Sequence, residues 1–310
     1  MRTSTQLDGS DVSVVIPTWR RYELLERCLD GVLSQEPSPG EVLVVARPDD
    51  VEALKVIEEA AVRGPVRWVE VTEPGHVPPV RAALDATTTD LIAVIDDDAV
   101  PKPGWLAGLV DVMRDHSVVC VGGHVYTEGN QPIVHPDAGK IRWYGQYVGN
   151  VAAVEAADPL DVDSVMEGNW CWRASVLRSL AFDPVLARDD AVMYGFDLCL
   201  QAKARGGRVV YTSAARVVHT PGPRAGSFNR HDHARARRSY SRNYTYIALR
   251  RFRGIRLLAF VVWWVLVGER ASYGLATAVV DGMRGRVGRD MITASFRGKV
   301  DGVRAWRRRA

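Results

Sequence analysis

Short, largely apolar runs alternate with longer amphipathic segments over the first hundred residues. The apolar runs at 11–17, 41–46, 66–71 and 91–95 have the length and composition of buried strands. Between them, apolar residues recur every three or four positions over 24–33, 51–63 and 78–86, which predicts helices with one buried face. Strands that alternate with helices over short links favour a mainly parallel sheet made of β-α-β units.

The pattern is less regular after residue 98. It predicts a helix over 105–114, a strand over 118–125, irregular structure over 126–158, and two short strands, 209–211 and 216–219, around a turn. Residues 221–238 are rich in Gly, Pro, Arg and His without any period, so we expect a mobile loop there.

These patterns predict four parts of the chain. They are a polar tail (1–10), an α/β domain (11–223) with two halves (11–100 and 101–223), a basic loop (224–245) and a basic helical extension (246–310).

An uninterrupted apolar run, 257–267, stands out in the extension. Its 11 residues are too few for a bilayer-spanning helix, which needs roughly 20. Arginines precede and follow the run, so two interpretations stay open: a core or oligomer-interface helix, or a helix lying in a membrane interface.

The composition is that of a globular protein, with 47% hydrophobic and 25% charged residues among 310. The four cysteines lack metal-binding spacing, and residues 1–11 are polar, so we expect reduced thiols and a cytoplasmic protein, or one peripheral on the inner face of the cell membrane.

The net charge of +3 conceals an asymmetry. Residues 1–223 carry 20 Lys and Arg against 32 Asp and Glu (−12), whereas residues 224–310 carry 20 against 5 (+15). A basic C-terminal quarter suggests a membrane surface or a diphosphate ligand as partner. Nucleic acid is not expected, because no recognised binding motif accompanies the arginines.

Three adjacent carboxylates, Asp96, Asp97 and Asp98, follow the apolar run 91–95 directly. Burying such charges is costly unless a cation neutralises them. At the carboxyl end of a strand in an open α/β sheet, where ligands usually bind, Mg²⁺ or Mn²⁺ suits carboxylates and substrate phosphates. A solvated acidic turn is the alternative.

Three segments occurring in order resemble the family-2 glycosyltransferases of the GT-A fold: the opening strand 12–17 with Thr-Trp-Arg-Arg after it, the acidic triplet, and 206–219, which ends at His219. The resemblance covers roughly residues 11–220, and it implies that 11–100 form a nucleotide-binding half and 101–223 an acceptor half. It implies a GT-A, Rossmann-like α/β domain that transfers a sugar from a nucleotide-diphosphate donor to an acceptor hydroxyl, with Mn²⁺ or Mg²⁺ bound and with inversion.

The resemblance also assigns roles to donor-site residues. Asp98 would bind the metal, Asp96 would lie near the ribose or the metal, Asp97 would assist either, and His219 would be a further metal ligand or a structural residue. The remaining candidates for donor binding are Pro17, Thr18, Arg20, Arg47, Asp50 and Arg81. The chain departs from the family after its second strand, where Ala-Arg-Pro-Asp-Asp replaces the usual base-reading acids. Arg47 would stack on a base or meet a phosphate, and Asp49 or Asp50 would read the base.

Residues for the acceptor side are implied in the same way. Glu167 and Asn169 would bind sugar hydroxyls, and Trp170 or Trp172 would stack on a sugar ring unless they pack in the core. The usual Glu-Asp pair that supplies the base falls on Tyr194 and Gly195. That departure leaves Asp197, otherwise a helix cap, and the loop residues Asp189 and Asp190 as candidates.

The basic loop 224–242, with His231 and His233, would close over the diphosphate or remain a solvated loop.

The acceptor would be a small molecule, a lipid-linked sugar or a glycan, and the protein could also form a homo-oligomer. The alternatives to a transferase are a non-catalytic nucleotide-sugar binder and an aspartate-dependent phosphohydrolase, although the latter's Asp-x-Asp-x-Thr order lacks its threonine here. A retaining mechanism also stays open.

Overall fold

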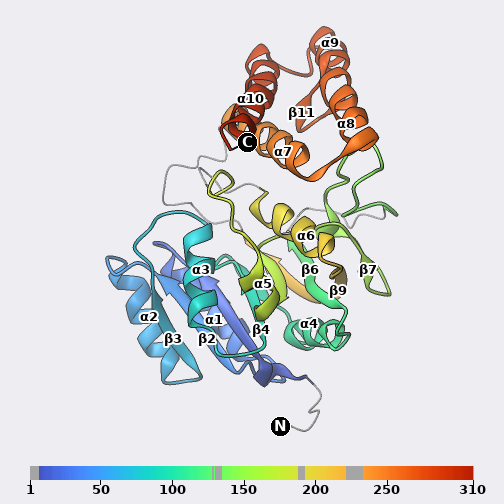
Figure 1. The fold of residues 1–310 in the computed structure, drawn as a ribbon. Helices are drawn as coiled ribbons and strands as arrows, with labels where there is room; N and C mark the ends of the chain where they lie inside the picture. Colours follow the sequence, from blue (N-terminus) through green and yellow to red (C-terminus); the bar gives the residue numbers. More distant parts are fainter. Residues whose placement is uncertain (1–6, 128, 130–134, 188–192, 221–232, 310) are drawn as a thin grey trace. The chain divides into compact units, whose positions relative to one another are not determined.

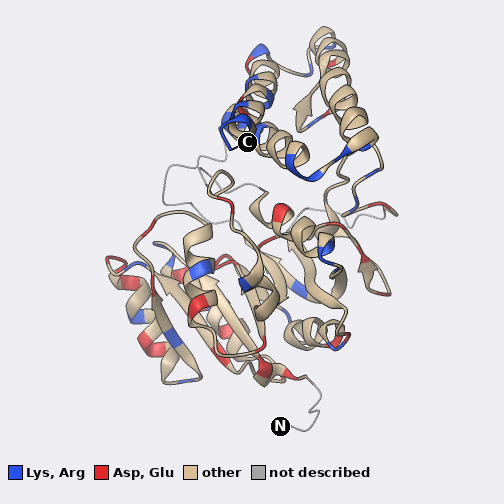
Figure 2. Cartoon of the chain, in the orientation of Figure 1, with Lys and Arg blue, Asp and Glu red and all other residues tan. Residues whose placement is uncertain are grey.

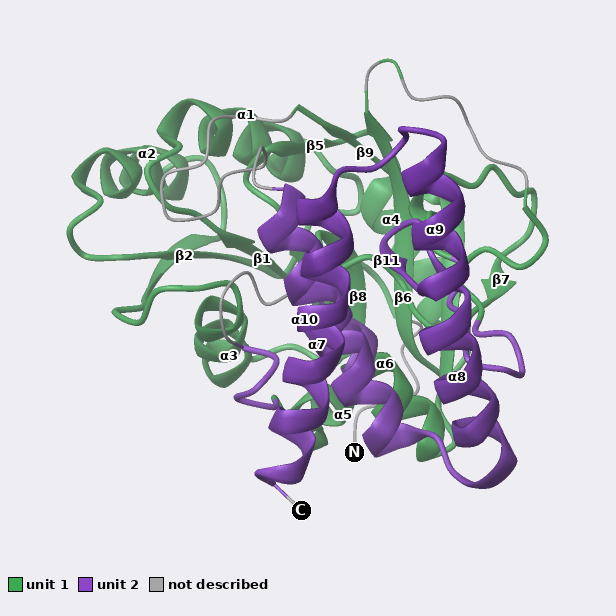
Figure 3. Cartoon of the chain, turned by 90° about the horizontal axis from the view of Figure 1, so that it is seen from above, with its two compact units in different colours: residues 1–140, 149–182, 198–225 green, residues 141–148, 183–197, 226–310 purple. Residues whose placement is uncertain are grey.

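The chain divides into two compact units in the computed structural model, which describes residues 7–127, 129, 135–187, 193–220 and 233–309. Unit 1 comprises 1–140, 149–182 and 198–225, and unit 2 comprises 141–148, 183–197 and 226–310 (Figure 3). The expected boundary after residue 223 lies close to the division at residue 225. The main difference is that 141–148 and 183–197 belong to unit 2 together with the C-terminal residues.

A nine-stranded sheet forms the centre of unit 1 (Figure 1). Its strands follow the order β3-β2-β1-β4-β8-β6-β9-β5, with β7 paired to β9. The strands are β1 (Val12–Pro17), β2 (Glu41–Ala46), β3 (Val66–Glu70), β4 (Leu91–Ile95), β5 (Ala99–Pro101), β6 (Val118–Thr127), β7 (Leu160–Asp161), β8 (Asn169–Arg173) and β9 (Arg208–His219). The first four are parallel to one another, β8 is antiparallel to β4 and β6, and β9 is parallel to β6.

Helices cover both faces of this sheet. The side chains of α1 (Tyr22–Leu33), α2 (Val51–Ala61) and α4 (Trp105–Met113) share one apolar core with every second residue of β1 and β2. The alternate strand residues, also buried, lie on the face of α3 (Val77–Ala86) and α5 (Ala174–Ser179) (Figure 3). Short 3₁₀ turns, η1 (Gly9–Asp11) and η2 (Val151–Ala153), complete the unit, and α6 (Tyr194–Ala204) spans the boundary between the units.

The structure confirms the alternating strands and helices of the first hundred residues to within two or three residues at each end, and it corrects two later predictions. The two short strands 209–211 and 216–219 are one continuous strand, β9, with an irregular register beside β6. After the acids, the short strand β5 pairs with β9. The predicted loop is wrong from His233 onward, where α7 begins; His231 lies outside the described residues.

Unit 2 is mainly helical. Its helices are α7 (His233–Arg251), α8 (Gly254–Leu266), α9 (Leu275–Met283) and α10 (Arg289–Arg307), with a small hairpin of β10 (Gly268–Glu269) and β11 (Ser272–Tyr273). Gly298 and Gly302 of α10 allow close packing on α7, since a Cβ on either would lie 2.4–2.5 Å from a carbonyl oxygen of that helix. In the described part of the chain, no helix combines the length and apolar character needed to cross a membrane.

Candidate active site

The ends of two adjacent strands bring the acidic triplet beside the segment that follows β1. Strands β1 and β4 are parallel neighbours, so their carboxyl ends meet at the same edge of the sheet. Asp96 follows β4 directly, and Thr18 follows β1, where its amide extends the pairing by donating to Val45 O at 3.0 Å. A positive φ of 55° at Arg20 turns the chain before α1 begins.

Asp97 is held by groups from the end of β1. Its Oδ2 accepts from the Thr18 hydroxyl at 2.8 Å, and its Oδ1 accepts from Arg21 Nη1 at 2.7 Å. Burial raises the pKa of Asp97 to about 6, although Arg21 and Thr18 act in the opposite direction. Burial also acts to lower the pKa of Arg21, but the nearby acids outweigh it and hold that pKa above its usual value.

Asp98 connects the triplet with the far end of β9. The short strand β5 pairs Ala99 with His219, and this pairing places His219 Nε2 3.2 Å from Asp98 Oδ1. The other carboxylate oxygen, Oδ2, accepts from Arg21 Nη1 at 3.1 Å. The Asp98 side chain is only 3% exposed, so it lies between two nitrogen-bearing side chains in a buried setting.

Asp96 is the exposed member of the triplet, and a glycine makes room for it. Its amide donates to Gly168 O at 3.2 Å, directly before β8. A Cβ on Gly168 would lie 2.2 Å from Asp96 Oδ2, so any other residue there would displace this carboxylate.

These side chains fit a divalent cation as part of a ligand set. Asp98 and His219 supply one oxygen and one nitrogen donor, and Asp96 adds a carboxylate on the same turn. Within the described ranges, no group of three or more His, Cys, Asp and Glu side chains is arranged to hold a metal ion. A donor set this small suits an ion that takes one or two carboxylates and completes its coordination with phosphate oxygens.

Residues expected near the nucleotide base form a second group at the ends of β1 and β2. The Trp19 ring has the guanidinium carbons of Arg20 and Arg47 at 4.6 and 4.3 Å from its centroid. Asp50 is 5% exposed, accepts from the Arg20 amide, and caps α2 through the Ala53 amide at 3.5 Å. Asp50 thus has a structural role, whereas Arg47 and Trp19 present polar and aromatic surface.

The other donor candidates are placed less centrally. Pro17 is the last residue of β1, and Arg81 lies exposed on α3. Asp49 forms an ion pair with Arg47, with Oδ1 and Nε 3.3 Å apart.

The acceptor candidates after Met166 need correction, because most of them belong to the core. Asn169 is fully buried: its amide nitrogen donates to His124 O and Ala215 O, and its oxygen accepts from Trp105 Nε1 at 2.8 Å. Because both ends of this side-chain amide are hydrogen-bonded inside the core, Asn169 does not bind a sugar hydroxyl. Glu167 is half-buried in the turn before β8. It lies near the triplet, because its neighbour Gly168 accepts a hydrogen bond from the Asp96 amide.

Trp170 and Trp172 likewise pack in the core. Both are fully buried in β8, with ring centroids 5.4 Å apart in an edge-to-face arrangement. The expectation that one of them stacks on a sugar ring is therefore wrong, since neither offers an exposed face.

Of the three candidate bases, only Asp197 lies within the described residues. It belongs to unit 2, near the start of α6, and both its oxygens bind Arg251 of α7, at 2.7 Å from Nε and 2.8 Å from Nη2. Its side chain is thus engaged in a buried, bidentate ion pair. Asp189 and Asp190 lie outside the described residues.

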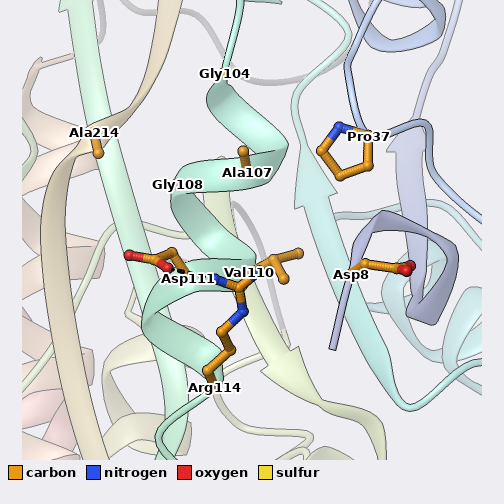
Figure 4. A pocket seen from close by; sticks show the side chains of 9 residues that line it. All are labelled: Asp8, Pro37, Gly104, Ala107, Gly108, Val110, Asp111, Arg114 and Ala214. Carbon is orange, nitrogen blue, oxygen red and sulfur yellow. Dashed lines mark hydrogen bonds and ion pairs between the residues drawn. The ribbon is translucent and has the colours of Figure 1, made fainter. Parts of the chain in front are cut away.

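A shallow pocket of about 330 Å³ in unit 1 contains none of the predicted site residues. It lies beside α4, between Gly104 and Arg114 on one side and Asp8 and Pro37 on the other (Figure 4). The Arg114–Asp111 ion pair, at 2.7 Å, occupies its polar part. The pocket offers no cluster of catalytic groups, so the acidic strand end remains the candidate active site.

Sequence reasoning missed two residues of this site. Arg21, rather than its neighbour Arg20, reaches the acids, and the sequence does not reveal the left-handed turn at Arg20 that directs it there. Gly168 was also missed, although a glycine directly before an apolar strand is a signal for close backbone approach.

Comparison with known proteins identifies relatives along most of the chain. Residues 9–241 match the model of the family described as "Glycosyltransferase like family 2". A pre-mycofactocin glycosyltransferase of Mycobacterium tuberculosis is 27% identical over 216 residues, which are 67% of this chain and 42% of that protein. A glucosyl-dolichyl phosphate glucuronosyltransferase of Haloferax volcanii is 30% identical over 118 residues, 37% of this chain and 38% of that protein. The matches thus span about two fifths of the length of these relatives.

A solved structure shares the fold. The mannosyltransferase from Pyrobaculum calidifontis, solved with GDP-Man and Mn²⁺, has a TM-score of 0.61 and 17% identity, and the alignment covers 94% of this chain and 87% of that one. The match confirms the expected α/β architecture with its C-terminal helices. This chain belongs to the family-2 glycosyltransferases, and its fold is GT-A.

Proposed function

We propose that the protein transfers a sugar from a nucleotide-diphosphate donor to an acceptor hydroxyl, with a divalent cation bound and with inversion at the anomeric carbon. The observation that carries this proposal is the meeting of Asp98 and His219 beside Asp96 at the end of β4, in a chain of this family. The Pyrobaculum mannosyltransferase supports it, because that protein was solved with a nucleotide sugar and Mn²⁺.

Asp98 and His219 would hold the cation, with Asp96 adding an oxygen or meeting the ribose. We favour Mn²⁺ over Mg²⁺, because an imidazole nitrogen suits a less hard ion. The cation would stabilise the negative charge that develops on the departing diphosphate. Arg21, 14% exposed beside Asp97 and Asp98, is close enough to add a second positive charge there.

The base of the donor would lie against Trp19 and Arg47. The Trp19 ring is a stacking surface, and the Arg47 guanidinium is a planar donor that can stack on the base or bind its acceptor edge. Because Asp50 caps α2, we assign base reading to Arg47 and Asp49.

An inverting transfer also needs a base that takes the proton of the acceptor hydroxyl. Asp190 and Asp197 are the candidates. The bidentate ion pair with Arg251 engages both oxygens of Asp197, which favours Asp190 for this role.

The names of the two relatives suggest two different classes of acceptor. One relative's name refers to glucosyl-dolichyl phosphate, a lipid-linked sugar, and the other's to pre-mycofactocin. We propose a lipid-linked acceptor first, because the C-terminal residues 224–310 carry a charge of +15, which suits the phosphate of such a substrate.

The test is a donor panel. Purified protein is incubated with Mn²⁺ and UDP-, GDP- or dTDP-linked sugars, and the release of nucleoside diphosphate is compared with and without a lipid phosphate-linked sugar. We expect one nucleotide class to support acceptor-dependent release, with Asp98→Asn inactive. Binding of a nucleotide sugar without release would favour the non-catalytic binder, and release from simple phosphoesters would favour the phosphohydrolase.

A further inference from the structure

Two successive helices of unit 2 expose an apolar face. In α8 the buried side chains are Phe260 and Trp264, and the side chains that recur at helical spacing on another face are exposed. The same holds for α9, where Ala278 alone is buried. We define the apolar strip as six residues that are 41–79% exposed: Leu258, Val262, Val265, Leu275, Val279 and Met283.

The two helices that carry the strip are joined closely. The Gly274 amide, directly before α9, donates to Val267 O at the end of α8, at 3.1 Å. Figures 1 and 3 both show α9 following α8 along one edge of unit 2. Soluble monomers rarely expose large apolar patches unless a partner or a membrane covers them, and six exposed apolar side chains on two adjoining helices are unusual in this respect.

Arginines border the strip at both ends. Between residues 253 and 289 the chain carries six arginines and two acids, a balance of +4. Arg253 precedes α8, while Arg284, Arg286 and Arg289 follow α9, and all four are exposed. Blue residues accordingly mark both ends of the α8–α9 segment in Figure 2.

An exposed tryptophan lies next to α8 from another part of unit 2. Trp143 is 71% exposed, and its ring packs edge-on against Tyr144, which in turn contacts Trp263 of α8 at 5.5 Å between centroids. Tryptophan with one face open is enriched where apolar and aqueous regions meet at a membrane surface.

We propose that the apolar strip docks on the headgroup region of an anionic lipid bilayer, with the bordering arginines on the lipid phosphates. An apolar helix face, a basic border and an exposed tryptophan are the parts of an interfacial membrane site. Neither α8, with 13 residues, nor α9, with 9, is long enough to span, so the contact is peripheral. This inference rests on unit 2 alone and holds whichever donor unit 1 binds.

A second copy of the chain fits this surface less well. A two-fold interface would bring the same strip of two copies together, and with it the two arginine borders. Like charges would then be close, because Glu269 and Asp281 offset only two of the six arginines between residues 253 and 289, whereas anionic lipids supply the opposite charge.

The test is co-sedimentation of the full chain with vesicles of phosphatidylglycerol and phosphatidylcholine (1:1), compared with phosphatidylcholine alone. We expect binding to the anionic vesicles that falls steeply with added salt. The double variant Val262→Asp with Met283→Asp should bind about tenfold more weakly or worse. Val62→Asp, an equally polar change at an 88% exposed position of unit 1, should bind like the wild type.

Two further readouts keep the test decisive. Trp143→Ser, outside both helices, should also weaken vesicle binding, so the result does not depend on folding of the double variant. Nucleoside diphosphate binding by the variants should be unchanged, which separates this proposal from the donor chemistry. No binding of the wild type to anionic vesicles, or a dimer in light scattering that Val262→Asp dissociates, would overturn the proposal.

Discussion

Arg21 Nη1 lies 2.7 Å from Asp97 Oδ1, and the same nitrogen lies 3.1 Å from Asp98 Oδ2. A single guanidinium therefore offsets part of the charge of two buried carboxylates and reduces the repulsion between them. The other oxygen of Asp98, Oδ1, faces His219. Because Arg21 already binds Oδ2, a cation that binds Asp98 competes with Arg21. The arginine explains how the acidic strand end is stable before any metal binds.

Arg21→Met should lower stability and raise metal affinity together. Removing one partner of a buried ion pair leaves uncompensated charge, which costs about 3 kcal/mol. The same removal takes away a cation that competes for Asp98, so the apparent affinity for Mn²⁺ should rise by about tenfold. Urea unfolding and calorimetric titration measure the two effects. Arg20→Met, which changes the neighbouring arginine, should alter neither by a comparable amount, and a weaker Mn²⁺ affinity in Arg21→Met would show that Arg21 positions the acids instead.

Gly168→Ala should impair donor binding while the fold persists. The added methyl group would lie 2.2 Å from Asp96 Oδ2 and push that carboxylate away from the site. We expect the affinity for nucleoside diphosphate with Mn²⁺ to fall by about tenfold. Gly282→Ala is the matched control, because its methyl group would meet only Ile292 Cδ1, at 3.8 Å. Equal affinities in the two variants would exclude a role for the glycine.

We expect Asp190→Asn to impair catalysis and Asp197→Asn to impair stability. Loss of a general base lowers kcat by about 10²–10⁴ with little change in donor binding, and we expect this of Asp190→Asn. Asp197→Asn should instead lower stability, because Arg251 loses its charged partner. Single-turnover rates and unfolding curves of both variants separate the two roles. A folded Asp197→Asn protein without turnover, beside an active Asp190→Asn, would reverse the assignment.

Unit 2 should become more stable as the pH rises past 8. Burial lowers the pKa of Lys299 to about 8, against a partial opposing effect of Glu269. Between pH 8 and 10 the unfolded chain keeps the lysine proton and the folded chain has lost it, so stability rises with pH. Relative to Lys299→Met, the wild type should gain up to about 2 kcal/mol between pH 7.5 and 10. A constant difference in unfolding free energy across this range would contradict the shifted pKa.

The fold of residues 12–127 could be predicted closely because its signals are local. Strands such as Glu41–Ala46 are uniformly apolar, and the helices between them have a regular spacing of buried residues. The continuous strand β9 could not be predicted, since Ser213 and Ala214 at its irregular register resemble a turn in sequence. Helix α7 was missed for a related reason: its first turns are polar, and its stability comes from packing on α10.

The site was predictable where chemistry follows directly from strand ends. Asp98 and His219 were both expected, and the pairing of β5 with β9 brings them together. The roles of Asn169, Trp170 and Trp172 were not predictable, because a short apolar strand with polar and aromatic residues does not show which side chains face the core. The partner of Asp197 is equally invisible in sequence, since Arg251 is 54 residues away and meets it only through tertiary packing.

The most direct test of the donor site is the thermal stability of the wild type, Asp98→Asn and His219→Gln with UDP or GDP, each with and without Mn²⁺. Ligands that bind the native state raise the melting temperature by mass action. We predict a rise in the wild type that requires both one nucleotide and Mn²⁺, that is absent in Asp98→Asn and that is reduced in His219→Gln. An equal rise in all three proteins, or one that does not depend on Mn²⁺, would contradict a metal-dependent donor site at Asp98.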